Sequence, residues 1–110
     1  MLVFCVQKDI TAIYGNFVVA SESDGYRLTV RDYDTSSSSA SDELADANGM
    51  QFTTKDRDND EENHRNCASD MKGGFWWRHC DDDYRLTAEG SRFKWSDSRL
   101  TRASMYVACA

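Results

Sequence analysis

The clearest alternation of apolar and polar residues lies between residues 14 and 33. The segment YGNFVVA (14–20) is aromatic and β-branched, which predicts a strand. In YRLTVRDY (26–33), Tyr26, Leu28 and Val30 fall on one predicted face, a pattern typical of a half-buried strand. Between them, SESDG (21–25) ends in the turn signal Asp24-Gly25. The sequence therefore predicts a β-hairpin over residues 14–33.

Shorter elements are predicted elsewhere in the chain. The apolar start, residues 1–6, is too short to span a membrane or to serve as a signal segment, and it predicts a core strand. Residues 42–47 predict one helical turn capped by Asp42. Residues 50–54, 92–95 and 103–109 predict strands, whereas 34–43 and 55–70 are typical of loops. The pattern indicates a mixed fold of short strands and long loops, held by disulfides or metal.

Composition narrows the function classes. The chain has 110 residues, which is typical of one small domain or of part of a larger one, and a formal net charge of −6. No basic patch stands out, so a nucleic-acid binder is not expected, and an anionic membrane surface is disfavoured. No nucleophile elbow, zinc-protease motif, phosphate-binding loop or dinucleotide fingerprint occurs. We therefore expect a protein that is not an enzyme.

Four cysteines, at positions 5, 67, 80 and 109, allow three pairings if all are oxidised. Cys67 and Cys80 would close a loop of about 13 residues, worth on the order of 3 kcal/mol. A zinc site of these two cysteines with His64 and His79 is the alternative, but adjacent His79 and Cys80 suit a tetrahedral site poorly. We favour the disulfide.

The run KDRDNDEENHRNC (55–67) is the strongest candidate for a cation site. Asp56, Asp58 and Asp60 alternate as in the start of an EF-hand loop, but Glu61 and Cys67 stand where that loop needs glycine and glutamate. An EF-hand is therefore excluded. Carboxylates and loop carbonyls still suit calcium better than magnesium. A solvated acidic loop without a metal is the competing interpretation.

The three aromatic residues at positions 75–77 also have two interpretations. Consecutive aromatic side chains can form a platform on which a sugar or an acetyl group stacks, or they can pack in the core. Core packing is the commoner role, and we expect at least Trp76 to be buried.

Several segments taken together resemble one family. The segments are SESDGYRLTVRDY (21–33), Asp42-x-Leu44 followed by NGMQFTTKDRDND (48–60), NCA (66–68) and KGGFWWRHC (72–80), with a weaker match in FKWSDSRLTRASMYV (93–107). In this order they resemble the fibrinogen-related domain of ficolins, tachylectins, tenascins, angiopoietins and fibrinogen chains. The resemblance implies an α+β fold with a small twisted antiparallel sheet. It identifies residues 14–110 as the C-terminal portion of such a domain, divergent or truncated, and residues 1–13 as an N-terminal remnant.

The resemblance also implies a calcium loop. By analogy, Asp58 and Asp60 donate side-chain oxygens, and backbone carbonyls from about Glu62 to His64 complete the shell. The family has a disulfide that corresponds to Cys67–Cys80. The peptide bond before its second cysteine, here His79–Cys80, is often cis and borders the ligand pocket.

The implied function is secreted, extracellular, calcium-dependent recognition of acetylated or other glycans, as in innate-immune lectins. Trp77, His79, Cys80 and Asp81 would form the pocket wall. Asp81 stands where lectin members usually carry histidine. A protein–protein interaction module, as in angiopoietin-like or tenascin-like relatives, is therefore the second hypothesis. A degenerate fragment without ligand is the third. Many family members form oligomers through N-terminal segments.

Overall fold

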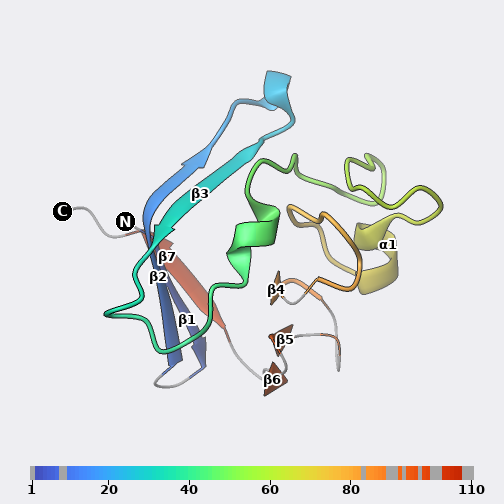
Figure 1. Cartoon of the computed structure of the whole chain (residues 1–110). Coiled ribbons are helices and arrows are strands. Elements are labelled where there is room, and N and C mark those ends of the chain that lie inside the picture. The colour runs from blue at the N-terminus through green and yellow to red at the C-terminus, as the bar shows by residue number, and fades with distance from the viewer. Residues whose placement is uncertain are drawn as a thin grey trace.

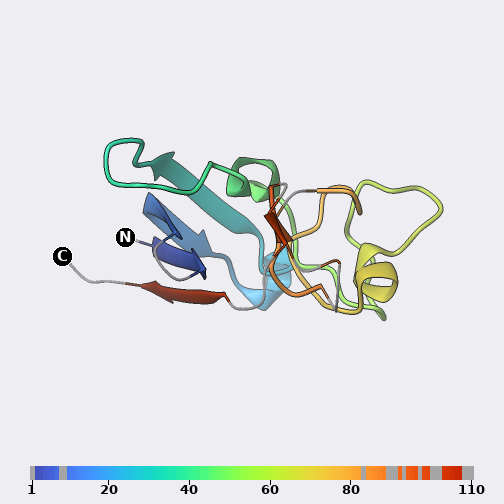
Figure 2. The ribbon, with the colours of Figure 1, turned by 90° about the horizontal axis from the view of Figure 1, so that it is seen from below.

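The computed structural model describes residues 2–7, 10–82, 84–88, 92, 94–96, 98–99 and 103–107. Figure 1 shows a sheet on one side of the molecule and a loop-rich part that contains the short helix α1 on the other. The same two parts lie side by side when the molecule is turned in Figure 2. No helix among the described residues is long and apolar enough to cross a bilayer.

The predicted hairpin is confirmed. Strand β2 (Ile10–Val19) pairs antiparallel with β3 (Leu28–Tyr33), and Phe17 lies opposite Val30. The 3-10 helix η1 (Glu22–Asp24) forms the connection, and Gly25 follows it with a left-handed φ of 61°. Glycine adopts this conformation without steric cost, which explains the Asp24-Gly25 signal. Strand β2 begins earlier than the pattern indicates, at Ile10.

The hairpin is part of a four-stranded antiparallel sheet with the order β3-β2-β1-β7. Strand β1 (Leu2–Gln7) pairs with β2 on one side and with β7 (Ser104–Val107) on the other. The predicted strand at the start of the chain and the one near its end are thus neighbours. The predicted division at residue 14 falls inside β2, which continues through it. Cys5 lies in β1, and Cys109 lies outside the described residues.

The loop-rich part contains short elements. They are the 3-10 helix η2 (Leu44–Ala47), helix α1 (Cys67–Met71), and the three-stranded sheet of β4 (Tyr84–Arg85), β5 (Lys94–Trp95) and β6 (Ser98–Arg99). The sequence pattern did not predict α1. Asn66 caps it by accepting the backbone N–H of Ser69. Asparagine is a preferred helix N-cap.

Three local predictions are wrong. Residues 50–54 form bridges at Thr53 and Thr54 instead of a strand, because the N–H of Phe52 bonds to the carbonyl of Gly25 at the hairpin turn. Asp42 does not cap η2: Glu43 holds that position without a side-chain bond. Tyr26 is exposed, because it lies in the turn with a φ of 56° and not on the strand face.

Aromatic side chains fill much of the core between the two parts. Trp77, Tyr14 and Tyr84 are among the largest fully buried side chains. The ring of Trp77 stacks on Tyr84 at 6.0 Å, and Trp76 meets Phe52 edge-on at 5.2 Å. The expectation that Trp76 is buried is confirmed. The aromatic run is therefore core, and it supports the loops that carry the charged residues.

Candidate functional site

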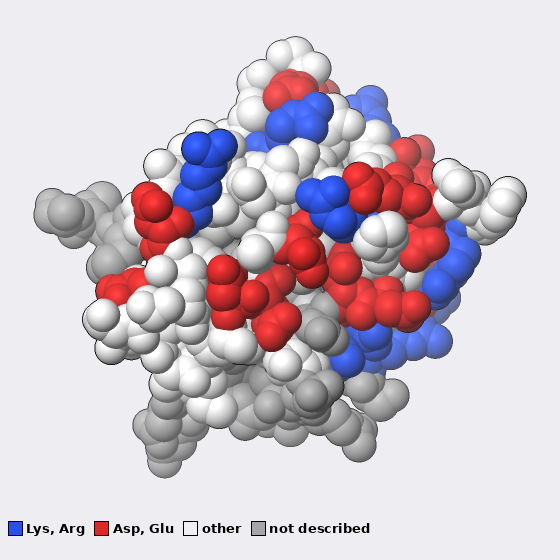
Figure 3. Space-filling model, viewed as in Figure 1, with Lys and Arg blue, Asp and Glu red and all other residues white. Residues whose placement is uncertain are grey.

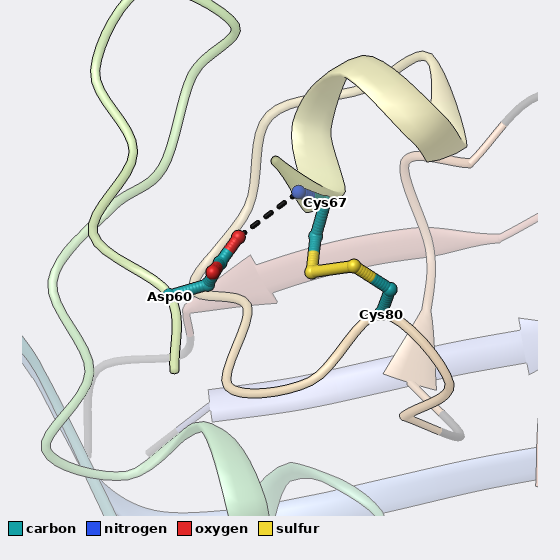
Figure 4. Close-up of side chains that lie close together, drawn as sticks. All are labelled: Asp60, Cys67 and Cys80. Carbon is teal, nitrogen blue, oxygen red and sulfur yellow. Dashed lines mark hydrogen bonds between the residues drawn. A yellow bond between two sulfur atoms is a disulfide. The ribbon is translucent and has the colours of Figure 1, made fainter. Parts of the chain in front are cut away.

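The acidic loop is organised around the carboxylate of Asp60. One of its oxygens accepts the N–H of Glu62 and the other accepts the N–H of Cys67, each at 2.9 Å. The N–H of Asp60 in turn donates to Oδ1 of Asp58 at 3.2 Å. Figure 4 shows the Asp60 carboxylate pointing at the start of α1, beside the disulfide. The structure thus places Asp58 next to Asp60 through this hydrogen bond.

The negative charges of Asp60 and Asp58 are suited to a cation. Partial burial raises the pKa of Asp60, and the nearby Asp58 carboxylate raises it further, whereas the two backbone N–H groups oppose the shift. Two carboxylates this close repel each other until a cation or a proton neutralises them. Their hard oxygen atoms are the donors that calcium prefers. The donor chemistry of Asp58 and Asp60 therefore fits a hard cation such as calcium.

The other two predicted metal residues are placed differently. Glu62 is half-buried, and its Oε1 lies 3.5 Å from Nδ1 of His79. His64 is exposed. Their backbone carbonyls remain the predicted ligands, because both side chains lie outside the Asp58–Asp60 pair.

The predicted disulfide is confirmed: Cys67 and Cys80 are bonded, with Cα atoms 4.8 Å apart. Both residues are fully buried. Ligand atoms of Asp60, Cys67 and Cys80 lie within 4.8 Å of one another, but sulfurs joined in a disulfide cannot act as thiolate ligands. In this oxidised form the zinc alternative is wrong, and neither His64 nor His79 joins the group of ligand atoms.

The segment after Trp77 presents the exposed candidate ligand residues. His79 and Asp81 have side-chain exposures of 51% and 81%. His79 lies between two glutamates, 3.7 Å from Glu61 and 3.5 Å from Glu62. Asp81 lies 3.8 Å from Arg85. The acidic loop and this segment are therefore in direct contact.

Three of the implications for the pocket need correction. Cis peptide bonds are absent from the described residues, so the His79–Cys80 bond is trans. Trp77 has no exposed surface and cannot form a pocket wall. Its indole N–H donates to the carbonyl of Gly73, so even its polar atom faces inward. Cys80 is likewise buried, which leaves His79 and Asp81 as the accessible members of the predicted set.

Asp82 fixes the shape of this segment, a role that the sequence did not reveal. Its Oδ2 accepts the N–H of Arg78 at 3.1 Å, the N–H of His79 at 2.8 Å and the hydroxyl of Tyr84. The N–H of Asp82 donates to the carbonyl of His79, closing a turn. In the sequence Asp82 is one of three consecutive aspartates. Among them Asp82 is the one that stands two residues before Tyr84, whose hydroxyl it accepts.

Arg78 connects the segment to the rest of the molecule. Its guanidinium donates to the carbonyls of Asp46 and Asn48, and it pairs with Glu61 at 2.9 Å. Acidic side chains spread across the middle of the face shown in Figure 3. Arg78 therefore joins η2, the acidic loop and the segment that carries His79.

Comparisons with known proteins agree with the resemblance. The family model for the C-terminal globular domain of fibrinogen beta and gamma chains matches residues 4–101. Human fibrinogen C domain-containing protein 1 is 50% identical over 66 residues, which are 60% of this chain and 13% of that protein. Ryncolin-4 from Cerberus rynchops is 39% identical over 69 residues, which are 63% of this chain and 19% of that protein.

A solved structure shares the fold. The fibrinogen-like globe domain of human ANGPTL6 has a TM-score of 0.74 and 25% identity, covering 94% of this chain and 54% of that one. The chain thus spans about half of that solved domain and a fifth or less of the two curated relatives.

Proposed function

Because this chain belongs to the family of fibrinogen C-terminal globular domains, we propose that it is an extracellular recognition module that binds acetylated or other glycans when loaded with calcium. The observation that carries the proposal is the position of Asp60. Its backbone N–H donates to Oδ1 of Asp58 in the acidic loop, and its carboxylate accepts the N–H of Cys67. Cys67 is bonded to Cys80, which lies between His79 and Asp81 in the sequence. A cation held there would steady the segment that faces the ligand.

Calcium would act as a structural cofactor in this proposal. It neutralises the Asp58 and Asp60 carboxylates, which otherwise repel each other. The backbone N–H bonds to Asp60 already orient its carboxylate, so little ordering remains for the metal to impose. Recognition itself rests on His79 and Asp81, which are accessible and held in a turn by Asp82.

Thermal unfolding of the oxidised chain tests the metal. Calcium at a hundredfold excess over its dissociation constant should stabilise the fold by about 2.7 kcal/mol. Magnesium should stabilise it less, and a chelator should reverse the effect. Asp58→Asn should abolish the response, whereas Asp46→Asn, an equal charge change on an exposed side chain outside the loop, should preserve it. An unchanged midpoint with calcium would sink the calcium part of the proposal.

Competition binding tests the ligand class. N-acetylglucosamine should bind in calcium and lose affinity in chelator, and glucose should bind less well in both. His79→Ala and Asp81→Asn should weaken binding, with Asp46→Asn as the matched control. If no acetylated sugar competes while calcium still stabilises the fold, the lectin function is wrong.

A protein–protein interaction module is the second candidate, and the charge of the site favours it. Arg78 is engaged by Glu61 and by backbone carbonyls, so the accessible acidic groups around the segment are those of Glu61 and Asp81. Together with a chain charge of −6, this surface suits a basic peptide segment. Calcium-dependent binding to a lysine-rich peptide, reduced by salt and insensitive to acetylated sugars, would support this candidate.

A further inference from the structure

A cavity of about 510 Å³ lies beside α1, away from the residues of the proposed recognition site. Its volume falls within the range of roughly 300–1,000 Å³ that small-molecule sites occupy. Among the described residues, Asp58, Asp60, His79 and Asp81 do not line it. The polar lining comes from Thr54, Lys55, Asp56, Ser69 and Lys72, followed by a glycine pair.

The two walls of this cavity are fastened together by Asn66. Its side-chain amide donates to the carbonyls of Thr54 at 3.0 Å and Lys55 at 3.2 Å, on the wall that opens the acidic loop. Its Oδ1 accepts the N–H of Ser69 at 3.2 Å, on the wall formed by α1. The cavity is therefore formed before any ligand arrives, which lowers the ordering cost of binding.

The charges of the lining are unusual for this acidic chain. Lys55 and Lys72 are exposed, and neither forms an ion pair within the described part of the molecule. The carboxylate of Asp56 accepts the hydroxyl of Thr54 at 2.7 Å. The cavity thus offers two ammonium groups and one carboxylate. Figure 3 shows basic side chains along the right-hand edge, in the region where Figure 1 places α1.

Lys72 has a backbone conformation that glycine adopts more easily than lysine does. It ends α1 with a φ of 64°, in the left-handed region. For a residue with a side chain this conformation is unfavourable. Residues held in such conformations gather at ligand sites. A lysine here places an ammonium group at the cavity at the expense of stability.

We propose that this cavity binds an acidic sugar whose carboxylate lies between the ammonium groups of Lys55 and Lys72. The two lysines would bind one negative group, and Asp56 would accept hydrogen bonds from the sugar hydroxyls. The hydroxyls of Thr54 and Ser69 add neutral donors and acceptors. A ligand with one anionic group and several hydroxyls matches this set, whereas a polyanion would meet repulsion from Asp56. The site is independent of the proposed calcium-dependent function.

Titration of the isotope-labelled oxidised chain, followed by the backbone amide resonances, tests the proposal. The probes are sodium D-glucuronate, glucose as its neutral counterpart, and sodium sulfate as an anion without hydroxyls, all at constant ionic strength. Glucuronate should shift the amides of Ser69, Gly73 and Gly74 and bind more tightly than the other two probes. Shifts confined to residues 78–82, or equal binding of glucuronate with glucose or sulfate, would overturn the proposal.

Variants test the two lysines. Lys55→Gln and Lys72→Gly should each weaken glucuronate binding about fivefold, the effect of losing a charge contact of about 1 kcal/mol. Lys72→Gly relieves the left-handed backbone, so the thermal midpoint should stay the same or rise, and lost binding cannot reflect unfolding. Arg31→Gln is the matched control, an exposed arginine on β3 outside the cavity. Equal weakening in Arg31→Gln, or unchanged affinity in both lysine variants, would contradict the proposal.

Discussion

The carboxylate of Asp60 accepts the backbone N–H of Cys67 at 2.9 Å. This hydrogen bond fastens the acidic loop to the first residue of α1 and, through the disulfide, to Cys80. Asp60 is thus a structural residue whether or not a metal is bound. The acidic run is therefore more than a solvated loop, although its net charge alone would suggest one.

Replacement of Asp60 by asparagine should separate these two roles. The amide nitrogen of asparagine cannot accept a hydrogen bond, so one of the two backbone N–H groups, from Glu62 or Cys67, loses its partner. We expect a loss of about 1–3 kcal/mol in the free energy of unfolding, measured by denaturant titration in chelator. Asp46→Asn should change it by less than about 0.5 kcal/mol. Equal stability of the two variants would contradict the structural role.

The disulfide makes a second contribution that can be measured. The double variant Cys67→Ala, Cys80→Ala opens a loop with a sequence separation of 13. We expect it to lose about 3 kcal/mol in the free energy of unfolding. Denaturant midpoints of the oxidised chain, the reduced chain and the double variant provide the comparison. A reduced chain as stable as the oxidised one would show that packing alone holds the segments around Cys67 and Cys80 together.

Two glycines should respond differently to alanine. A Cβ on Gly73 would stand 1.9 Å from the carbonyl oxygen of Thr87, so the backbone must shift. Gly49 has open space around its Cβ position, but its φ of 84° is unfavourable for alanine. We expect a loss of about 3 kcal/mol for Gly73→Ala and about 1 kcal/mol for Gly49→Ala. The reverse order in thermal unfolding would contradict the close approach of residues 73 and 87.

Neighbouring aspartates provide another matched pair. Asp82 accepts three hydrogen bonds, whereas Asp81 has a single ion contact of 3.8 Å and is 81% exposed. Asp82→Asn should cost about 1–3 kcal/mol and shift the amide resonances of Arg78 and His79. Asp81→Asn should leave stability within about 0.5 kcal/mol. Similar amide shifts in both variants would argue against the turn centred on Asp82.

Alkaline pH should weaken the fold through two buried tyrosines. Burial raises the pKa of Tyr14 and of Tyr84 above the ordinary value of 10.0, and hydrogen bonds to Asp42 and Asp82 add to the effect. Above pH 10 the unfolded chain loses these protons while the folded chain keeps them. The free energy of unfolding should therefore fall as the pH rises, by up to about 1.4 kcal/mol per pH unit for each tyrosine.

Tyr14→Phe is the control for this pH dependence. The variant loses its hydroxyl contacts with Asp42 and Leu44, so it is less stable at neutral pH. Its stability should nevertheless fall less steeply above pH 10 than that of the original chain, as measured by denaturant titration at several pH values. Equal slopes would show that Tyr14 ionises in the folded state.

The hairpin and the disulfide could be predicted because their signals are local. Alternation across 26–33 and a glycine suited to a left-handed turn determine β3 and its connection. The burial of Trp77 could not be predicted from a local sequence signal. An aromatic run looks alike on a surface or in a core, and its burial depends on contacts with Phe75 and Tyr84.

In the candidate site, too, some residues are implied by the sequence and others are not. The resemblance implies Asp58 and Asp60 as metal ligands, which stays a prediction, whereas the structure shows that the N–H of Asp60 bonds to Oδ1 of Asp58. Asp82 and Arg78 act on backbone groups of other segments, such as the carbonyls of Asp46 and Asn48. Such contacts leave no periodic trace in the sequence. The trans His79–Cys80 bond is likewise a property of this chain that the resemblance did not imply.

The pairing of β1 with β7 sets the order in which this molecule can be assembled. Leu2 lies opposite Val107, so the sheet closes a loop of nearly the whole chain. Closing so long a loop has a large entropic cost and slows folding. During synthesis, β1 can pair with β2 as soon as both have emerged, but its other edge stays open until residues 104–107 arrive. An open edge is a template for pairing with other chains. Once residues 104–107 have paired, the edge moves from β1 to β7, so the strand that arrives last becomes the edge of the described sheet.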